Sequence, residues 1–268
     1  MDVDMHSIEP STGSASGVAN NINTVHEALQ QYKIRSLPNS FYYIPDFLSI
    51  TESDALLQKI PGQRWTQLSK RRLQAHPSTL TKQDVLISAS LPTWLTTAPA
   101  PILARFEDLG VFADTKHGAP NHVLINEYRP GEGIMPHEDG AAYYPIVATV
   151  SLSSTLCLDI YEKRGDDGAL SPGDDTRHTP KWRVLQEPRS LLVTCGSAYT
   201  DTLHGISEIE IDRDLSSETI ANWNLLGDSS AFAKEEGMNL RETRISLTYR
   251  DVLKVSKAGL KILGRSRG

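Results

Sequence analysis

The spacing of hydrophobic positions along this chain changes near residue 123. From there on, short apolar runs alternate with Gly, Pro and Asp, and each run has about the length of one strand of a sheet. Repeated short strands separated by turns are typical of a β-sandwich or jelly roll. The pattern predicts strands at residues 123–129, 146–152, 156–161, 182–186, 189–195 and 243–252.

Three segments before residue 123 have the spacing of amphipathic helices instead. Thr24 followed by Glu27 forms a capping-box pattern ahead of an apolar stripe. A second helix is predicted to begin near Thr51, with Asp54 in the third position, and to end before a Pro-Gly pair. A third covers about 101–109. We expect these helices to cover the outside of a sheet.

Polar segments divide the rest of the chain. Residues 1–21 are rich in Ser, Gly, Asn and acids, and we expect them to be disordered. Residues 22–268 are expected to form a single domain with two inserted loops, 163–181 and 212–241. The first has the composition of a solvated loop. The second is left open, because its Trp, Leu and Phe residues need a surface to cover.

Composition limits the possible functions without naming one. The 268 residues, with 39% hydrophobic content, can bury the core of one domain, and we expect a monomer. The net charge of -6 gives no overall basic surface, so binding to nucleic acid would need a local patch. Cys157 and Cys195 lie in apolar runs and form no C-x-x-C, which favours buried free thiols in a reducing compartment. We therefore expect an intracellular protein, of nucleus and cytoplasm. No 18-residue apolar stretch or signal-peptide pattern is present, so we expect neither a membrane span nor secretion, and no membrane contact.

Two metal-ligand types occur together in the short stretch 126–140. On an extended segment, His137 and Asp139 of an H-x-D pair share one face and can bind one ion. The best candidate for a third ligand is His204, 65 residues after Asp139. Two histidines and one carboxylate leave three coordination positions open, as in non-haem Fe(II) oxygenases. Taken alone, each of these residues would more readily be interpreted as part of a hydrogen-bonded surface pair.

Two arginines near the C-terminus add an independent signal. Arg244 and Arg250 lie on the same face of a strand-like run, because their spacing is even. A planar guanidinium is a natural partner for a carboxylate of 2-oxoglutarate. Alone, the two arginines would be read as exposed charges on a sheet. Their order after the H-x-D pair and the distal histidine makes coincidence a poor explanation.

The combined motif order resembles the AlkB family of Fe(II)/2-oxoglutarate dioxygenases. The matching features are an Asn-x-Tyr at Asn126 and Tyr128, then H-x-D, a distal His and R-x5-R. The stretches PGEGIMPHEDG, YYP and EPRSLLV are most similar to one branch of that family, that of the sixth eukaryotic homologue. The resemblance extends from about Leu37 to about Leu263.

The resemblance implies a mainly β fold with flanking helices, in the α+β class, with a double-stranded β-helix (jelly roll) core. It implies Fe(II) bound by His137, Asp139 and His204, with 2-oxoglutarate and O2 as co-substrates. The far carboxylate of 2-oxoglutarate would pair with Arg244. Further co-substrate contacts are expected from Asn126, Tyr128, Ser246 and Arg250. Such a site oxidises a methyl group on nitrogen, which is then lost as formaldehyde.

The substrate is less constrained by the sequence. Lys70, Arg71 and Arg72 follow an aromatic residue and could contact a nucleic-acid backbone, or could form a solvated basic turn. Tyr143 and Tyr144 follow the metal pair closely and could stack on a flipped base or line the pocket wall.

Three hypotheses therefore remain open. The first is oxidative demethylation of alkylated RNA or single-stranded DNA. The second is hydroxylation or demethylation of a protein side chain. The third is a nucleic-acid-binding module with little turnover. The complete ligand set favours the two enzymes over the third. The local basic cluster favours nucleic acid, whereas the acidic chain argues for protein.

Overall fold

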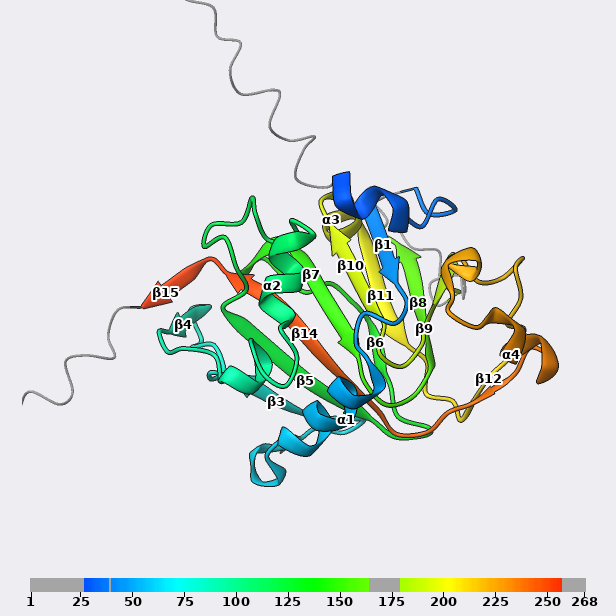
Figure 1. The fold of residues 1–268 in the computed structure, drawn as a ribbon, viewed down its shortest axis with the longest axis horizontal. Helices are drawn as coiled ribbons and strands as arrows, with labels where there is room; N and C mark the ends of the chain where they lie inside the picture. Colours follow the sequence, from blue (N-terminus) through cyan, green and yellow to red (C-terminus); the bar gives the residue numbers. More distant parts are fainter. Residues whose placement is uncertain (1–26, 39, 164–178, 257–268) are drawn as a thin grey trace, which may run out of the picture.

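Two antiparallel β-sheets face each other in the computed structural model, which describes residues 27–38, 40–163 and 179–256 (Figure 1). The major sheet has the order β1 (Ser40–Ile44), β10 (Leu191–Cys195), β7 (Tyr143–Ser151), β14 (Arg244–Val252), β5 (His122–Tyr128), β3 (Arg72–His76) and β2 (Thr66–Gln67). The minor sheet has the order β6 (Ile134–His137), β11 (Thr202–Ile206), β8 (Leu156–Glu162) and β9 (Trp182–Gln186). The predicted jelly-roll core is confirmed.

The six predicted runs all form strands, and nine shorter strands among the described residues escaped prediction. Strands β1, β3, β6 and β11 have four or five residues each. Pro136 interrupts the apolar pattern of β6, and Gly205 that of β11. Tertiary pairing, rather than local sequence, therefore decides that these segments are extended.

The helices lie where the hydrophobic periodicity predicted them, except that one of them begins at a different N-cap residue. Helix α1 (Ile50–Lys59) begins after Ser49, whose Oγ accepts a hydrogen bond from the Glu52 amide at 3.2 Å. The Glu52 side chain accepts one from the Ser49 amide at 2.8 Å, so the capping box lies two residues before the predicted Thr51 and Asp54. Helix α2 (Ile102–Asp108) matches the third prediction. The Thr24 cap lies outside the described residues, and a 3₁₀ helix follows at Glu27–Tyr32.

Short elements complete the described part of the chain. Helix α3 (Ser197–Asp201) separates β10 from β11. Strands β4 (Val85–Ile87) and β15 (Lys254–Ser256) pair in parallel. Two 3₁₀ helices occupy Gly62–Arg64 and Thr93–Leu95. Within the described ranges, no helix combines the length and the apolar character that crossing a bilayer requires.

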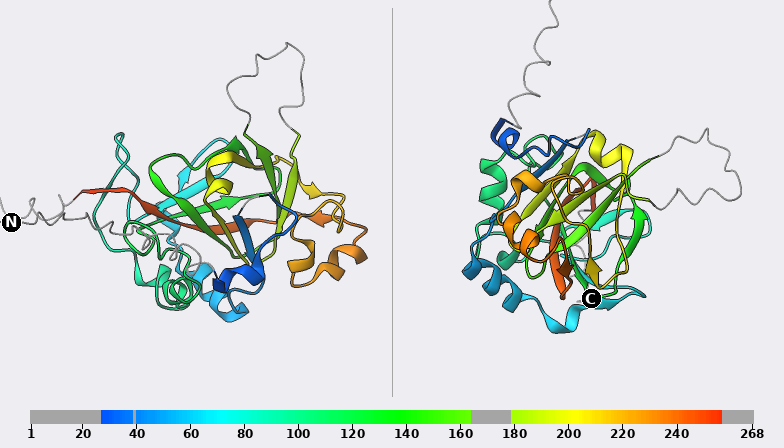
Figure 2. Two further views of the ribbon diagram at one scale, coloured as in Figure 1. Left: turned by 90° about the horizontal axis from the view of Figure 1, so that it is seen from above. Right: turned by 90° about the vertical axis from the view of Figure 1, so that its right-hand side faces the viewer.

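Hydrophobic packing occurs on both faces of the major sheet. On one face, Leu29, Leu56 and Phe106 from the helical segments pack with Val150 and Leu247 of the sheet. The predicted helical cover is therefore confirmed (Figure 2). Between the sheets, a second cluster contains Phe41, Leu158, Ile160, Val184 and Leu192. Burial of apolar surface on both faces holds the two sheets in a fixed relation.

Both cysteines are free and buried, as expected from their apolar surroundings. Cys195 belongs to the helix-covered cluster, and Cys157 lies on the far side of the minor sheet. Burial raises the pKa of Cys157 to about 12 and that of Cys195 to about 11. Both thiols are therefore protonated near neutral pH.

The segment 212–241 is folded and covers the outer face of the minor sheet. It begins at the end of β12 (Ile211–Asp212), contains a 3₁₀ helix (Trp223–Leu225) and α4 (Ser229–Lys234), and returns through β13 (Asn239–Leu240). Its aromatic and apolar side chains pack on β8 and β9; the contacting set is Trp223, Leu226 and Phe232 with Cys157 and Leu185. The other predicted insertion, 163–181, lies mostly outside the described residues.

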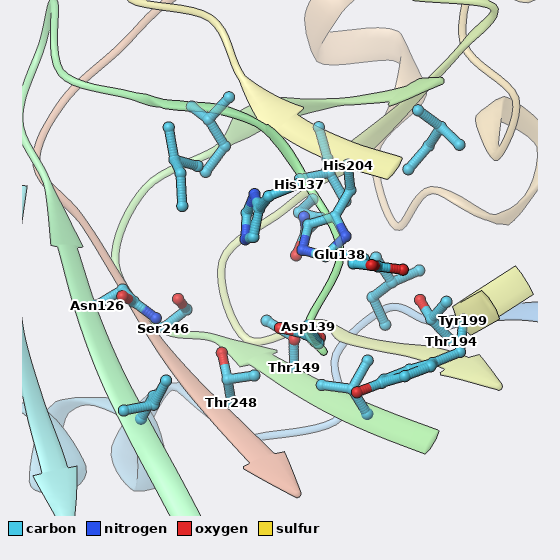
Figure 3. Close-up of a pocket in the computed structure, with 18 of the residues that line it drawn as sticks. Asn126, His137, Glu138, Asp139, Thr149, Thr194, Tyr199, His204, Ser246 and Thr248 are labelled. Carbon is cyan, nitrogen blue, oxygen red and sulfur yellow. The ribbon is translucent and has the colours of Figure 1, made fainter. Parts of the chain in front are cut away.

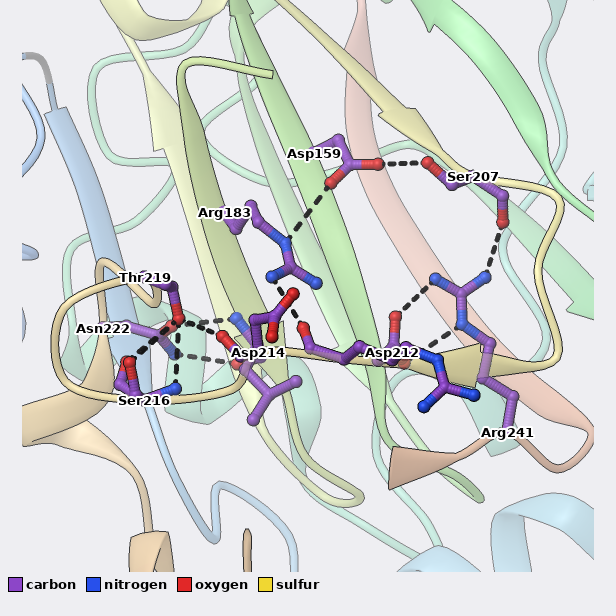
Figure 4. A network of polar contacts seen from close by, with 11 residues as sticks. Asp159, Arg183, Ser207, Asp212, Asp214, Ser216, Thr219, Asn222 and Arg241 are labelled. Carbon is purple, nitrogen blue, oxygen red and sulfur yellow. Dashed lines mark hydrogen bonds and ion pairs between the residues drawn. The ribbon is translucent and has the colours of Figure 1, made fainter. Parts of the chain in front are cut away.

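A buried ion pair joins the ends of this segment to the minor sheet (Figure 4). Arg241 donates to both carboxylate oxygens of Asp212, at 3.0 and 2.6 Å, and to the Ser207 carbonyl at 2.6 Å. The Ser207 hydroxyl donates to Asp159 on β8 at 2.5 Å. The Arg241 and Asp212 side chains are only 5% and 0% exposed. Ser207 directly follows β11, so the network connects the segment to that strand.

Replacement of Arg241 by Met should destabilise the fold strongly, because it leaves the Asp212 carboxylate buried without a counter-charge. The expected loss in the free energy of unfolding is about 3–5 kcal/mol. Urea unfolding followed by circular dichroism measures it. Arg213→Met is the matched control, because Arg213 is exposed on the same segment, and its loss should be about 0.5 kcal/mol or less. Equal losses in the two variants would contradict a stabilising role for the pair.

Candidate active site

Three possible metal ligands converge at one end of the cavity between the sheets (Figure 3). His137 is the last residue of β6, and His204 pairs with it in register on β11. One ligand atom from each histidine and from Asp139 lie within 4.8 Å of one another. Asp139 lies just beyond the end of β6, rather than within an extended strand as expected. The structure therefore brings the three residues together, with the carboxylate presented by a loop.

Two glycines allow β6 and β11 to approach closely beside the histidines. A Cβ at Gly133 would lie 2.2 Å from the Ile206 carbonyl oxygen, which is a severe clash. At Gly205 it would lie 3.1 Å from the Ile134 carbonyl oxygen. Glycine is therefore required at position 133, and at position 205 a larger residue would push the two strands slightly apart.

Hydrogen bonding and burial prepare both imidazoles to bind a metal ion. His137 Nδ1 lies 2.9 Å from the Met135 carbonyl oxygen. Because a carbonyl can only accept, Nδ1 carries the proton and Nε2 keeps its lone pair. Burial lowers the pKa of His204 to about 4, so this ring is neutral at physiological pH. Neutral imidazole is the form that coordinates metals.

The third ligand is held by an arginine. Arg250 forms an ion pair with Asp139, and its guanidinium lies 4.8 Å from the centre of the Tyr143 ring. Burial alone would raise the pKa of Asp139, but the opposing interactions, of which that with Arg250 is the largest, outweigh it and the pKa is lowered. Tyr199 donates to the Gly140 carbonyl at 2.8 Å and fixes the loop. Asp139 is thus an ionised carboxylate in a defined position.

Arg244 lies in the same cavity and carries a charge without a counter-charge. Its guanidinium donates to the Ser246 hydroxyl at 3.0 Å. It also donates to Ser151 and Gln186 at 2.9 Å each. All three partners are neutral, and its buried Nε has no partner. Burial lowers the pKa of Arg244 to about 10, which still leaves it cationic near pH 7. A buried charge of this kind is unfavourable until an anion binds, so the donor set fits a carboxylate.

Further polar side chains complete the wall of the cavity on the major sheet. Asn126 and Ser246 are paired in register, as are Tyr128 and Arg244. Asn126, Ser246 and Thr248 lie across the cavity from the two histidines in Figure 3. Sequence reasoning missed Thr149 and Thr248, which also line the cavity. These residues could have been found as polar positions that alternate with apolar ones along otherwise apolar strands.

The structure separates the three residues of the basic cluster. Lys70 is exposed and pairs with Glu208 at 2.9 Å. Arg72 pairs with the buried Glu127 at 2.6 Å and stacks on a tryptophan ring. Arg71 alone lines the cavity. The three cations therefore do not form one surface patch.

Neither tyrosine of the predicted pair is among the described residues that line the cavity. Strand β7 begins at Tyr143, three residues earlier than predicted. Both tyrosines therefore belong to the strand, and their side chains point to opposite faces of the sheet. Tyr144 packs against the helix-covered core, and Tyr143 supports Arg250. Both rings contact neighbouring side chains in this structure, and a contact of either with a base stays a prediction.

Comparisons with known proteins agree with this geometry. Residues 40–250 match the family described as the 2OG-Fe(II) oxygenase superfamily. The chain is 38% identical over 239 residues to a zebrafish protein (Danio rerio) described as "Probable RNA/DNA demethylase ALKBH6". That alignment covers 87% of this chain and 94% of the zebrafish protein.

More distant similarities were found as well. A Xenopus tropicalis protein, "tRNA (carboxymethyluridine(34)-5-O)-methyltransferase alkbh8", is 26% identical over 81% of this chain, which covers 32% of that protein. A solved structure, "The structure of OsALKBH1", covers 80% of this chain and 99% of its own, with 16% identity and a TM-score of 0.45.

Proposed function

Since this chain belongs to the 2OG-Fe(II) oxygenase superfamily and is an AlkB-family dioxygenase, we propose that it oxidatively demethylates RNA or single-stranded DNA. The description of the zebrafish relative as a probable RNA/DNA demethylase supports nucleic acid as the substrate class. The residues of the cavity support the oxidation.

His137, Asp139 and His204 would hold the Fe(II), since they offer two neutral imidazoles and one carboxylate on one side of an ion. When bound, the iron and 2-oxoglutarate supply the oxidation of a methyl group by O2, with release of succinate and carbon dioxide. Arg250 keeps the Asp139 carboxylate ionised and aimed at the metal.

The observation that carries the proposal is that one cavity holds both a group of metal ligands and a buried cation that needs an anion. A three-residue ligand group lies at one end, and the Arg244 guanidinium, without a carboxylate partner among the described residues, is buried in the same space. Arg244 would bind the far carboxylate of 2-oxoglutarate, while Asn126 and Tyr128 would donate hydrogen bonds to the co-substrate.

Succinate release from 2-oxoglutarate with Fe(II) tests the substrate class. A methylated single-stranded oligonucleotide should raise the rate, because a fitting substrate couples decarboxylation to oxidation, and its unmethylated counterpart is the control. A rise only with a cellular protein extract would favour a protein hydroxylase. Binding of the oligonucleotide without any rise would favour a binding module.

A further inference from the structure

A third guanidinium, that of Arg71, enters the cavity from the hairpin that joins β2 and β3. Strand β3 pairs with β5 through Arg72 and Glu127, so Arg71 lies one step further, beside Tyr128. The hairpin is fixed by its backbone. Leu68 donates to the Arg71 carbonyl at 2.9 Å, and Gly133 donates to the Lys70 carbonyl at 3.2 Å. Arg71 is therefore placed by the fold and is not a free surface side chain.

Arg71 differs from its two neighbours because nothing neutralises it. Lys70 and Arg72 each pair with a glutamate, whereas no acid in the described ranges pairs with Arg71. Its Nε is buried without a hydrogen-bond partner. Burial raises the pKa of Tyr128, and Arg71 is the strongest of the cations that counteract this effect. Its charge thus acts inside the cavity.

The charges that line the cavity leave a positive excess. Among the described residues, the lining contains Arg71, Arg244 and Arg250 against Glu138 and Asp139. Fe(II) and dianionic 2-oxoglutarate cancel each other when both are bound, so they do not change this excess. Glu138 is half exposed and pairs with Lys163, which weakens its influence inside. Three cations against two acids leave one excess positive charge. Arg250 is paired with Asp139 and Arg244 would contact the far carboxylate of the co-substrate, so the cation left without a carboxylate contact is Arg71.

We propose that Arg71 is a specificity-determining residue that makes the cavity select uncharged methylated bases over cationic ones. This inference rests on the proposed function, because it concerns the nucleobase that enters the same cavity. Arg71 lines the cavity without an acid partner among the described residues, so its terminal N–H groups could donate to a ring nitrogen or carbonyl oxygen, which an uncharged base offers. A base that carries a positive charge meets repulsion instead.

Pairs of isomeric methylated bases allow the effect of charge to be measured separately from the effect of size. N6-methyladenine is neutral near pH 7, whereas its isomer 1-methyladenine is protonated there and cationic. Repulsion between two like charges about 8 Å apart at an effective dielectric constant of about 20 corresponds to about thirtyfold in affinity. N4-methylcytosine and cationic 3-methylcytosine form a second such pair.

The test is the affinity of single-stranded RNA oligonucleotides that differ only in this base. Fluorescence anisotropy is measured without turnover, on protein loaded with 2-oxoglutarate and with Mn(II) in place of iron. The wild type should bind the N6-methyladenine oligonucleotide at least about tenfold more tightly than the 1-methyladenine one. Arg71→Gln should lose most of this preference and keep its affinity for 2-oxoglutarate. Lys70→Gln, which removes the neighbouring charge outside the cavity, should change both affinities by the same factor.

Three results would overturn the inference. One is equal or tighter wild-type binding of the cationic oligonucleotide. Another is a preference that survives in Arg71→Gln. The third is a loss of 2-oxoglutarate affinity in that variant, which would assign Arg71 to the co-substrate. If neither methylated oligonucleotide binds better than the unmodified one, the proposed function itself fails together with the inference.

Discussion

His204→Ala should abolish iron binding and turnover, because it removes one of only three protein ligands. Loss of a residue that merely hydrogen-bonds to a ligand typically weakens metal binding by about 10–100-fold, so loss of a ligand should exceed about a hundredfold. The imidazole is neutral and paired in register with His137, and it belongs to the one group of three possible metal ligands found among the described residues. Iron content after dialysis, with the folded state checked by circular dichroism, measures the effect.

His117→Ala is the matched control for this prediction. His117 bonds to Asp251 outside the cavity, so its loss should leave the bound iron unchanged. The same is expected of His76 and His122, which are buried away from the ligand group. Full iron occupancy in a folded His204→Ala protein would exclude His204 as a ligand.

Arg244→Lys should weaken 2-oxoglutarate binding by about ten- to hundredfold, although the positive charge is kept. The guanidinium already spans Ser246, Ser151 and Gln186 through its fixed donors, and an ammonium cannot reproduce this geometry. A charge-assisted hydrogen bond contributes about 1.5–3 kcal/mol, which corresponds to that range of affinity. Isothermal titration of 2-oxoglutarate into the Mn(II)-loaded protein gives the dissociation constant.

Arg129→Lys provides the comparison, because Arg129 is 59% exposed and outside the cavity lining. Its dissociation constant should equal that of the wild type. An unchanged constant in Arg244→Lys would move the carboxylate site elsewhere, and Arg250 would be the first residue to examine.

The ligand set and most of the major sheet were predictable because their signals are local. An H-x-D pair, a distal histidine and two arginines at even spacing are recognisable by residue type and order alone. Strands β5, β7, β10 and β14 are rich in apolar and β-branched residues. In these segments local sequence and tertiary structure favour the same conformation.

Other features depend on contacts between distant segments and left no local signal. Strand β6 is extended because it pairs with β11, despite Pro136. The hairpin that carries Arg71 is held by a backbone hydrogen bond between Gly133 and Lys70, which lie 63 residues apart in the sequence. The neutral surroundings of Arg244 come from β7 and β9 together. The spacing of residues in the sequence shows which side chains can belong to the site, but not which of their charges lack a partner of opposite charge in the folded protein.

The measurement that tests oxidative demethylation most directly is the ratio of formaldehyde to succinate formed on a methylated single-stranded oligonucleotide. Both products should appear in equal amounts. Both should require Fe(II) and 2-oxoglutarate, and both should be absent in His204→Ala. Succinate formation that no methylated oligonucleotide increases, without any formaldehyde, would contradict nucleic-acid demethylation as the function of this site.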